Sequence, residues 1–296
     1  MAKIIIRALR LPFITASILP FVFGSLIERS NFNYFCFFLG LVSVICTHLS
    51  ANLINDYADS KSGADWKDKN FYGLFGGSKL IQEGLLSEKF YLNLSIVFAV
   101  VAFLSVIILA IALNSLFVVF IYLTIIFLSW SYSHKPFQFS YCGLGEIFLF
   151  LLFGPALVMG GYFIQTGIFP DLKSFILSAP FGLFTTAILF ANEIPDYPQD
   201  KAARKFTWVS VSGPRKAFIL YYLLMFLGLA SIVLGFFLGY LKAFSLLSLL
   251  AAVIVLKAGR IIKKHYTEKM ELVKSSRMTI ALQSIISIIL IVGLFL

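Results

Sequence analysis

The sequence predicts an all-α, polytopic membrane protein with nine transmembrane helices, and three observations lead to this fold class. Hydrophobic residues make up 60% of the 296 and charged residues only 13%, whereas soluble domains carry roughly 25% charged residues. The apolar residues fall into long runs, and the basic residues alternate between the segments that join them. We therefore expect lipid to be the chain's main solvent and treat residues 1–296 as a single transmembrane domain.

Nine apolar runs of about 17–25 residues, the length that crosses a bilayer core, follow one another along the chain. They are centred near Leu19, Val44, Ala102, Phe120, Leu152, Phe184, Leu227, Leu249 and Ile286. The first run follows a short basic stretch, but no small-residue cleavage site comes after it, so we interpret it as a span rather than a signal peptide. Polar stretches remain at 58–89, 198–216 and 257–277, and we expect these to be cytoplasmic loops.

The basic residues predict how the helices are oriented. With the N-terminus placed inside, 21 of the 24 Lys and Arg residues fall on inside segments, and only Arg29, Lys173 and Lys242 fall outside. Cytoplasmic loops carry such an excess, so we expect a cytoplasmic N-terminus, an external C-terminus and an inner-membrane location. Topology and an anionic ligand then explain the formal net charge of +10, and we exclude a nucleic-acid partner.

Two acidic clusters occupy the ends of the second and sixth runs. In the first, three polar residues share one helix face because residues three or four apart are neighbours on a helix. In the second, we expect Pro195 and Pro198 to kink or end the helix. Both clusters follow even-numbered spans, so we place them on the cytoplasmic side, and their shared Asn-x3-Asp pattern is typical of an internal duplication. They read Asn52-Leu-Ile-Asn55-Asp56-Tyr-Ala-Asp59 and Asn192-Glu193-Ile-Pro-Asp196-Tyr-Pro-Gln-Asp200.

The clusters predict a site for Mg²⁺. Carboxylates at the ends of apolar helices are costly and usually functional, and facing carboxylates repel one another until a divalent cation binds. Oxygen ligands suit a hard ion such as Mg²⁺, which also binds substrate phosphates. The simpler alternative is a set of ordinary helix-end residues in headgroup water. We predict as metal ligands and catalytic residues Asp56, Asp59, Asp196 and Asp200, with Asn52, Asn55 and Asn192 beside them.

Several cations near the clusters are candidates for binding a diphosphate, which needs positive charge to leave as a stable anion. The stretch Gly76-Gly77-Ser78-Lys79 can also offer backbone N–H groups to phosphate. Solvent-exposed lysines of cytoplasmic loops are the alternative reading of these cations. The candidates are Lys79, Lys135, Lys201, Arg204 and Lys205.

Aromatic side chains near the clusters can stabilise an allylic cation through their π faces. Tyr132 is our catalytic candidate, with Tyr57 and Tyr197 as further possibilities. His48 lies in the middle of the second run, and we expect it to be a hydrogen-bonded packing residue.

The two acidic motifs, Asn55-Asp56-Tyr-Ala-Asp59 and Asp196-x3-Asp200, resemble those of the UbiA superfamily of intramembrane prenyltransferases. The stretch Arg10-Leu-Pro12-Phe-Ile-Thr-Ala-Ser17-Ile-Leu-Pro20 is similar to that family's first helix, and the resemblance runs essentially end to end. It implies a ring of helices around a central cavity, with Mg²⁺ and prenyl diphosphate held by the aspartates on the cytoplasmic side. It also implies that the diphosphate leaves and an aromatic acceptor attacks the allylic cation, while the lipid tail lies in a cavity open toward the bilayer.

Three further stretches look most like the menaquinone branch of that family, which prenylates 1,4-dihydroxy-2-naphthoate. They are Gly76–Gly84, Gly143–Phe148, and Phe153–Pro155 with Gly161–Gly167. This resemblance implies attack at the carboxylated ring carbon with loss of CO₂. It also implies that Glu146 lies at the cavity mouth, where it would help to bind metal or acceptor.

The chain departs from the family pattern at three points. Gly63 stands where the first motif often carries a third Asp, and Asp65 follows two positions later. Phe206 and Val211 stand where the family usually has arginines, and Arg204 is placed to compensate for the first.

Two alternatives to the menaquinone assignment remain open. One is a transferase of the same family for another acceptor, such as 4-hydroxybenzoate, a chlorin, haem or glycerol phosphate. The other is a membrane transporter, which would also carry polar groups at membrane depth and an internal repeat, although transporter sites lie near the midplane.

Overall fold

The computed structural model describes residues 2–63, 66, 68 and 70–296 of the chain. Asp65, which the sequence analysis singled out, lies outside the described residues. The described part is all-α, as predicted, and its one extended pairing is an isolated bridge between Cys142 and Phe206.

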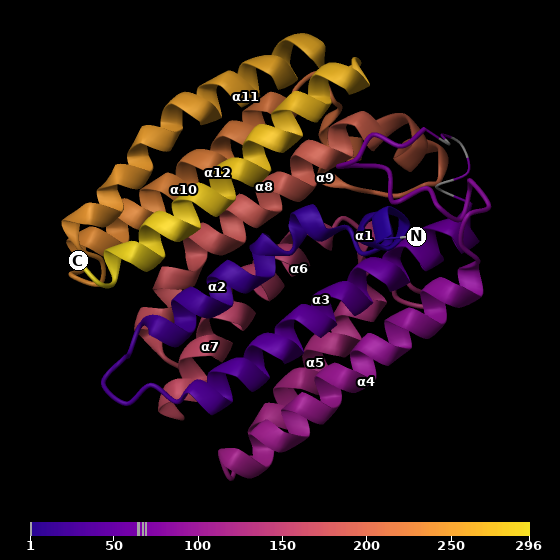
Figure 1. The fold of residues 1–296 in the computed structure, drawn as a ribbon. Coiled ribbons are helices and arrows are strands. Elements are labelled where there is room, and N and C mark those ends of the chain that lie inside the picture. Colours follow the sequence, from indigo (N-terminus) through magenta and orange to yellow (C-terminus); the bar gives the residue numbers. More distant parts are fainter. Residues whose placement is uncertain (1, 64–65, 67, 69) are drawn as a thin grey trace.

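The helices follow one another in a single antiparallel bundle. Figure 1 shows α10, α11 and α12 gathered on one side and α3, α4 and α5 on the other, with α2 and α8 between them. The α-helices are α1 (Ala2–Ala8), α2 (Thr15–Leu26), α3 (Tyr34–Ser62), α4 (Glu88–Ala112), α5 (Phe117–Ser131), α6 (Gly145–Leu151), α7 (Leu157–Thr166), α8 (Leu172–Ala202), α9 (Trp208–Ser212), α10 (Ala217–Phe237), α11 (Ala252–His265) and α12 (Lys269–Gly293). Shorter helical segments are η1 (Leu11–Phe13), η3 (Phe139–Tyr141), the π segment η4 (Leu152–Ala156) and η5 (Ala243–Ala251).

Seven helical stretches in the described chain are long and apolar enough to cross a membrane. The first and fourth predicted runs correspond to the shorter apolar helices Leu11–Leu26 and Phe117–Ser131. At 1.5 Å per residue the former extends about 24 Å, less than the roughly 30 Å of a bilayer core. The chain is therefore a multi-pass membrane protein, while the count of nine spans and their orientation stay predictions.

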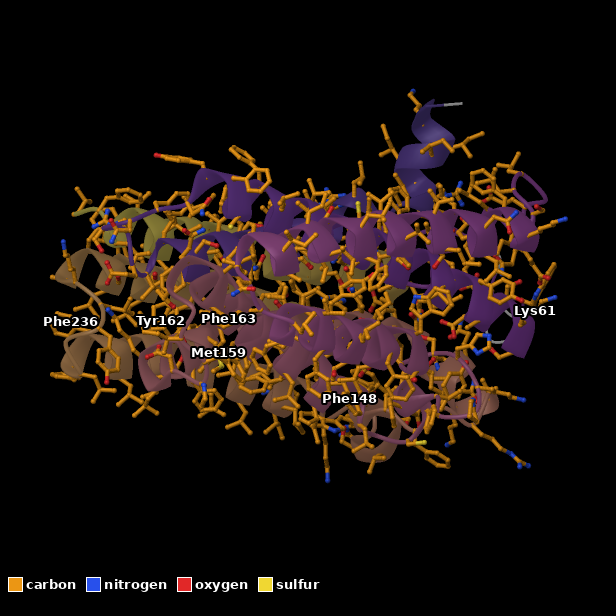
Figure 2. All side chains as sticks on the ribbon, turned by 90° about the horizontal axis from the view of Figure 1, so that it is seen from below. Lys61, Phe148, Met159, Tyr162, Phe163 and Phe236 are labelled. Carbon is orange, nitrogen blue, oxygen red and sulfur yellow. The ribbon has the colours of Figure 1, made fainter. Side chains whose placement is uncertain are left out.

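Labelled residues and the two termini mark the opposite ends of the bundle. Figure 2 shows Lys61 of α3 at one end and Phe236 of α10 at the other, with Tyr162 and Phe163 of α7 toward the end that carries Phe236. The N- and C-termini also lie at opposite ends (Figure 1), as an odd number of crossings requires.

The polar stretches contain more helix than the sequence analysis expected. Helix α3 continues to Ser62, α9 forms within 198–216, and 257–277 is helical apart from a break between His265 and Lys269. The last turn of α11 carries Lys263, Lys264 and His265. Cations stabilise the C-terminal end of a helix through its dipole, so these residues mark a helix end rather than a loop.

Helix α8 continues through Pro180, Pro195 and Pro198, so of the two expectations for the last two prolines, a kink or an end of the helix, the end is excluded. A proline inside a helix removes one backbone hydrogen bond and strains the preceding turn. Packing offsets that cost here, because α8 lies at the centre of the bundle against α6, α10 and α12, with Phe190 and Ile194 buried. The second acidic cluster therefore stands on a continuous helix face.

Candidate active site

The C-terminal ends of α3 and α8 bring the two acidic clusters to one pocket of about 110 Å³. Its acidic and amide lining comes from both helices, and its cations come from three different connecting segments. The polar side chains that line it are Arg10, Asn55, Asp59, Asp68, Tyr72, Lys79, Tyr132, Asn192, Glu193, Asp196, Gln199, Asp200 and Lys205. Below we call this space the acidic pocket.

The glycine-rich loop ties the two clusters together. The Gly76 N–H donates to Asp196 Oδ2 at 3.0 Å, and the Ser78 N–H donates to Asp56 Oδ2 at 3.0 Å. Gly76 and Gly77 have φ of 72° and 74°, a left-handed conformation that glycine adopts without steric cost. Two of the N–H groups expected to cradle phosphate are thus directed at the motif carboxylates instead.

Arg10 connects the N-terminal segment to the first cluster, and sequence reasoning did not assign it a role in binding. Its Nη1 donates to Asn55 Oδ1 at 3.2 Å and lies 3.5 Å from Asp56 Oδ1. Asp56 is 3% exposed and accepts hydrogen bonds from both Arg10 and Ser78. Asp56 therefore organises the loop and the arginine around the pocket, and it is not itself among the lining residues.

Lys205 is a cation close to the second cluster, with Nζ 3.8 Å from Asp200 Oδ1. Burial disfavours its charged form, but the carboxylates of Asp200 and Asp59 outweigh this and raise the pKa of Lys205 well above its usual range. The ammonium therefore stays charged through the neutral and mildly alkaline range. Tyr141, a residue that sequence reasoning missed, donates to Asp59 Oδ1 at 3.1 Å, and burial followed by the Asp59 charge raises the pKa of this phenol.

Asp68 lines the acidic pocket from the loop after α3. It accepts a hydrogen bond of 2.6 Å from Lys269 of α12 and one of 3.2 Å from Tyr72. Burial opposes ionisation, yet the hydrogen bonds from Lys269, Asn70 and Tyr72 hold the pKa of Asp68 below its usual value. No sequence pattern signalled this residue, because its partner lies 201 positions away.

The donor set fits a hard cation but does not enclose one. Buried oxygens of Glu193 (Oε2) and Asp200 (Oδ2) have no hydrogen-bond partner within the described part of the chain. Among the described residues, no three His, Cys, Asp or Glu side chains gather closely enough to hold a metal ion alone. Mg²⁺ typically keeps several waters and binds one or two carboxylates plus substrate phosphates, which is the incomplete set that this pocket offers.

Glu146 lies deeper than the resemblance implied. It is 1% exposed at the start of α6, where its Oε1 accepts the Trp208 N–H at 2.6 Å. Of Glu146 and Glu193, only Glu193 is among the residues that line the acidic pocket. Glu146 is therefore buried in the bundle and is not among the residues that line the acidic pocket or the larger cavity that adjoins it, rather than lying at a cavity mouth.

A second cavity of about 290 Å³ extends from the acidic pocket between α2, α3, α5, α7 and α8. Its walls are mostly apolar, and Asn52 and His48 are among its polar lining residues. Both spaces are lined by the same five residues at their junction, namely Arg10, Asn55, Tyr132, Leu189 and Asn192. Below we call this second space the apolar cavity.

Not every predicted cation reaches these spaces. Lys79 and Lys205 line the acidic pocket, whereas Lys135, Lys201 and Arg204 are exposed and are not among its lining residues. Phe206 and Val211, which replace two arginines of the family pattern, are 59% and 75% exposed. The positions of those substitutions therefore lie outside the pocket that the other motif residues build.

The fold and the site together define a helical membrane protein in which an acidic, cation-flanked pocket opens into an apolar cavity. The chain is, more particularly, a member of the UbiA prenyltransferase family, whose profile matches residues 17–282.

Relatives agree with this assignment. UbiA prenyltransferase domain-containing protein 1 of Dictyostelium discoideum is 27% identical over 222 residues, 73% of this chain and 66% of the relative. The chain thus spans slightly less than two thirds of that protein's length. The 1,4-dihydroxy-2-naphthoate octaprenyltransferase of Bacillus subtilis is 25% identical over 219 residues, 73% of this chain and 68% of the relative. A UbiA homologue from Archaeoglobus fulgidus, solved with GPP and Mg²⁺, shares the fold with a TM-score of 0.66 at 16% identity, over 98% of this chain and 97% of that one.

Proposed function

We propose that this chain is a Mg²⁺-dependent prenyltransferase that moves the prenyl group of a prenyl diphosphate onto an aromatic acceptor. The observation that carries the proposal is the junction of the two spaces, where the acidic pocket and the apolar cavity are lined by the same five residues. A prenyl diphosphate has the matching polarity, with its charged head in the acidic pocket and its hydrocarbon chain in the apolar cavity.

The carboxylates of Asp59, Asp196 and Asp200 would hold Mg²⁺ together with diphosphate oxygens. The unpartnered oxygen of Asp200 and the A. fulgidus homologue with bound GPP and Mg²⁺ support this part of the proposal. When bound, Mg²⁺ neutralises charge that develops on the departing diphosphate. Asp56 supports the pocket without lining it, because it accepts hydrogen bonds that hold Ser78 and Arg10 in place.

The cations of the pocket stabilise the leaving group. Lys79, Lys205 and Arg10 converge on the acidic pocket from the glycine-rich loop, the segment after α8 and the N-terminal segment. Preorganised charges of this kind act on the charge that develops in the transition state. As the bond between C1 and the diphosphate oxygen breaks, the electron pair leaves with the diphosphate and the prenyl group becomes an allylic cation.

Tyr132 lies at the junction, where C1 of the prenyl chain would come to rest. Its π face can stabilise the allylic cation until the acceptor ring attacks. A new bond then forms between C1 and a ring carbon, and that carbon expels a proton or CO₂.

We propose 1,4-dihydroxy-2-naphthoate as the acceptor, with loss of CO₂ in a step of menaquinone biosynthesis. The name of the B. subtilis relative and the three sequence stretches of the menaquinone type support this choice. We also propose that the site faces the cytoplasm across the inner membrane, because 21 of the 24 basic residues fall on that side of the predicted topology.

The test is an assay of the purified chain in detergent with Mg²⁺ and radiolabelled farnesyl or geranylgeranyl diphosphate. Dihydroxynaphthoate should yield a prenylated naphthoquinol and CO₂, and chelation of Mg²⁺ should stop the reaction. Product with 4-hydroxybenzoate alone would keep the reaction class and replace the acceptor. Absence of product with either, together with no Mg²⁺-dependent binding of prenyl diphosphate, would refute the proposal.

A further inference from the structure

Half of the buried polar atoms without a hydrogen-bond partner in the described part of the chain belong to side chains that line the two spaces. A bound Mg²⁺ with its diphosphate would supply a partner for the oxygens of Glu193 and Asp200. The other three belong to residues that line the apolar cavity, and a prenyl chain offers them no hydrogen bond. They are Nε2 of His48, Oγ1 of Thr185 and Oδ1 of Asn192.

These three atoms come from the two motif helices. Thr185 and Asn192 lie seven residues apart on α8, so they share one face, and Ile188 between them also lines the cavity. His48 lies on α3, one helical turn before Asn52. His48 and Thr185 are 7% and 4% exposed, so bulk water has little access to their side chains.

The His48 ring is fixed in place by its other nitrogen. Nδ1 lies 2.6 Å from Ser17 Oγ, and the ring meets Phe153 edge-on at 5.9 Å between centroids. Only Nε2 is left for a ligand. It donates in one tautomer and accepts in the other, and a hydroxyl group can satisfy either.

The separation of these groups points to a ligand larger than water. Seven residues of α-helix correspond to roughly 10 Å along the axis between Thr185 and Asn192. One water with hydrogen bonds of about 2.8 Å cannot reach both side chains. The cavity wall between them is hydrocarbon, formed in part by Ile188, Leu189 and Phe153. A flat apolar frame with hydroxyl groups at its edges matches this pattern of polar and apolar surface.

We propose that His48, Thr185 and Asn192 form a subsite that binds the hydroxyl groups of an aromatic acceptor. The inference rests on the proposed function, which it deepens by assigning the acceptor a place. Asn192 lines both spaces, so a ring bound here lies beside C1 of a prenyl diphosphate whose head occupies the acidic pocket. The subsite therefore selects hydroxylated rings and holds them in position for attack.

Equilibrium binding tests this without turnover. The full chain in detergent, loaded with Mg²⁺ and farnesyl thiolodiphosphate, is titrated calorimetrically with 1-hydroxy-2-naphthoate and with 2-naphthoate, which lacks the hydroxyl. We expect the hydroxylated ligand to bind more tightly to the unmodified chain. Thr185→Val keeps the side-chain shape and should weaken binding of the hydroxylated ligand about 3- to 10-fold, the effect of one lost hydrogen bond, with no change for 2-naphthoate.

Thr186→Val is the matched control. Its hydroxyl is 2% exposed and donates to the Glu146 main-chain oxygen at 3.4 Å, and it is not among the residues that line the cavity. It should leave both affinities unchanged. His48→Phe should abolish the preference for the hydroxylated ring, and Thr185→Val keeps the test decisive if that variant fails to fold.

Three outcomes would overturn the subsite. They are equal affinity of the unmodified chain for the two naphthoates, unchanged affinity in Thr185→Val, or equal losses in Thr185→Val and Thr186→Val. Each leaves the proposed function standing if radiolabelled prenyl transfer still occurs. Loss of Mg²⁺-dependent binding of farnesyl thiolodiphosphate itself would instead refute the proposed function.

Discussion

Replacing Lys205 with Met should remove most of the transfer activity, whereas replacing Lys201 with Met should leave it nearly unchanged. The two lysines follow the second acidic cluster four residues apart, so they are matched in residue type and in sequence setting. They differ in position, because Lys205 lines the acidic pocket with 17% of its side chain exposed, whereas Lys201 is exposed at the end of α8.

The charge of Lys205 and its fixed place in the pocket set the magnitude. Two unit charges 3.8 Å apart attract by about 4 kcal/mol at an effective dielectric constant near 20, before desolvation offsets part of it. Removing one preorganised donor from an enzyme site costs about 10²–10³ in kcat, and we expect Lys205→Met to fall in that range. An exposed lysine contributes little, so Lys201→Met should change kcat by less than about twofold.

Initial rates with Mg²⁺ and radiolabelled prenyl diphosphate measure both variants, and thermal unfolding in detergent monitors the fold. Lys205→Arg retains the charge and should recover part of the activity. Equal losses in the two Met variants, or full activity in Lys205→Met with an unchanged melting temperature, would refute the assignment of Lys205 to the leaving group.

Three further predictions follow from the same site. Asp56→Ala and Asp196→Ala should each lower turnover more than about 100-fold while membrane insertion persists, measured by transfer assay and membrane extraction; full activity in either would contradict a site built from both clusters. Gly76→Ala should lose roughly 1–2 kcal/mol of stability to its φ of 72° and also lose activity, because relief of that strain would move the N–H group that donates to Asp196 Oδ2. Gly84→Ala, at φ 71° with nothing within 4 Å among the described residues, should show the same melting shift with normal kinetics. Phe206→Arg should retain activity because that side chain is 59% exposed, and complete loss would show that it packs in the protein.

The residues that sequence patterns could place are those on the two motif helices. Asn55, Asp59, Asn192, Asp196 and Asp200 line one pocket because a spacing of three or four residues puts them on one face of a continuous helix. Even there, the sequence left open whether α8 ends at Pro195 and Pro198, since the burial that keeps this helix intact is a property of the whole bundle.

Residues outside those helices were harder to assign. Arg10, Asp68 and Tyr141 reach the site from connecting segments, where no periodicity indicates which way a side chain points. The cations posed the opposite problem, because the positive-inside rule places many lysines near the pocket and only the fold separates Lys205 from Lys135. Buried polar atoms such as Nε2 of His48 carry no sequence signal at all, because their lack of a partner depends on what packs around them.

The hydrogen bonds from the glycine-rich loop to both acidic helices have a spectroscopic consequence. The Gly76 and Ser78 N–H groups donate hydrogen bonds to Asp196 and Asp56, and these bonds slow the exchange of the two amides with solvent. A ligand that draws those carboxylates toward itself must lengthen or share the same bonds. The exchange rates of these two amides therefore report whether the site is occupied. Hydrogen–deuterium exchange of a peptide that covers 76–78 measures them without chemical turnover.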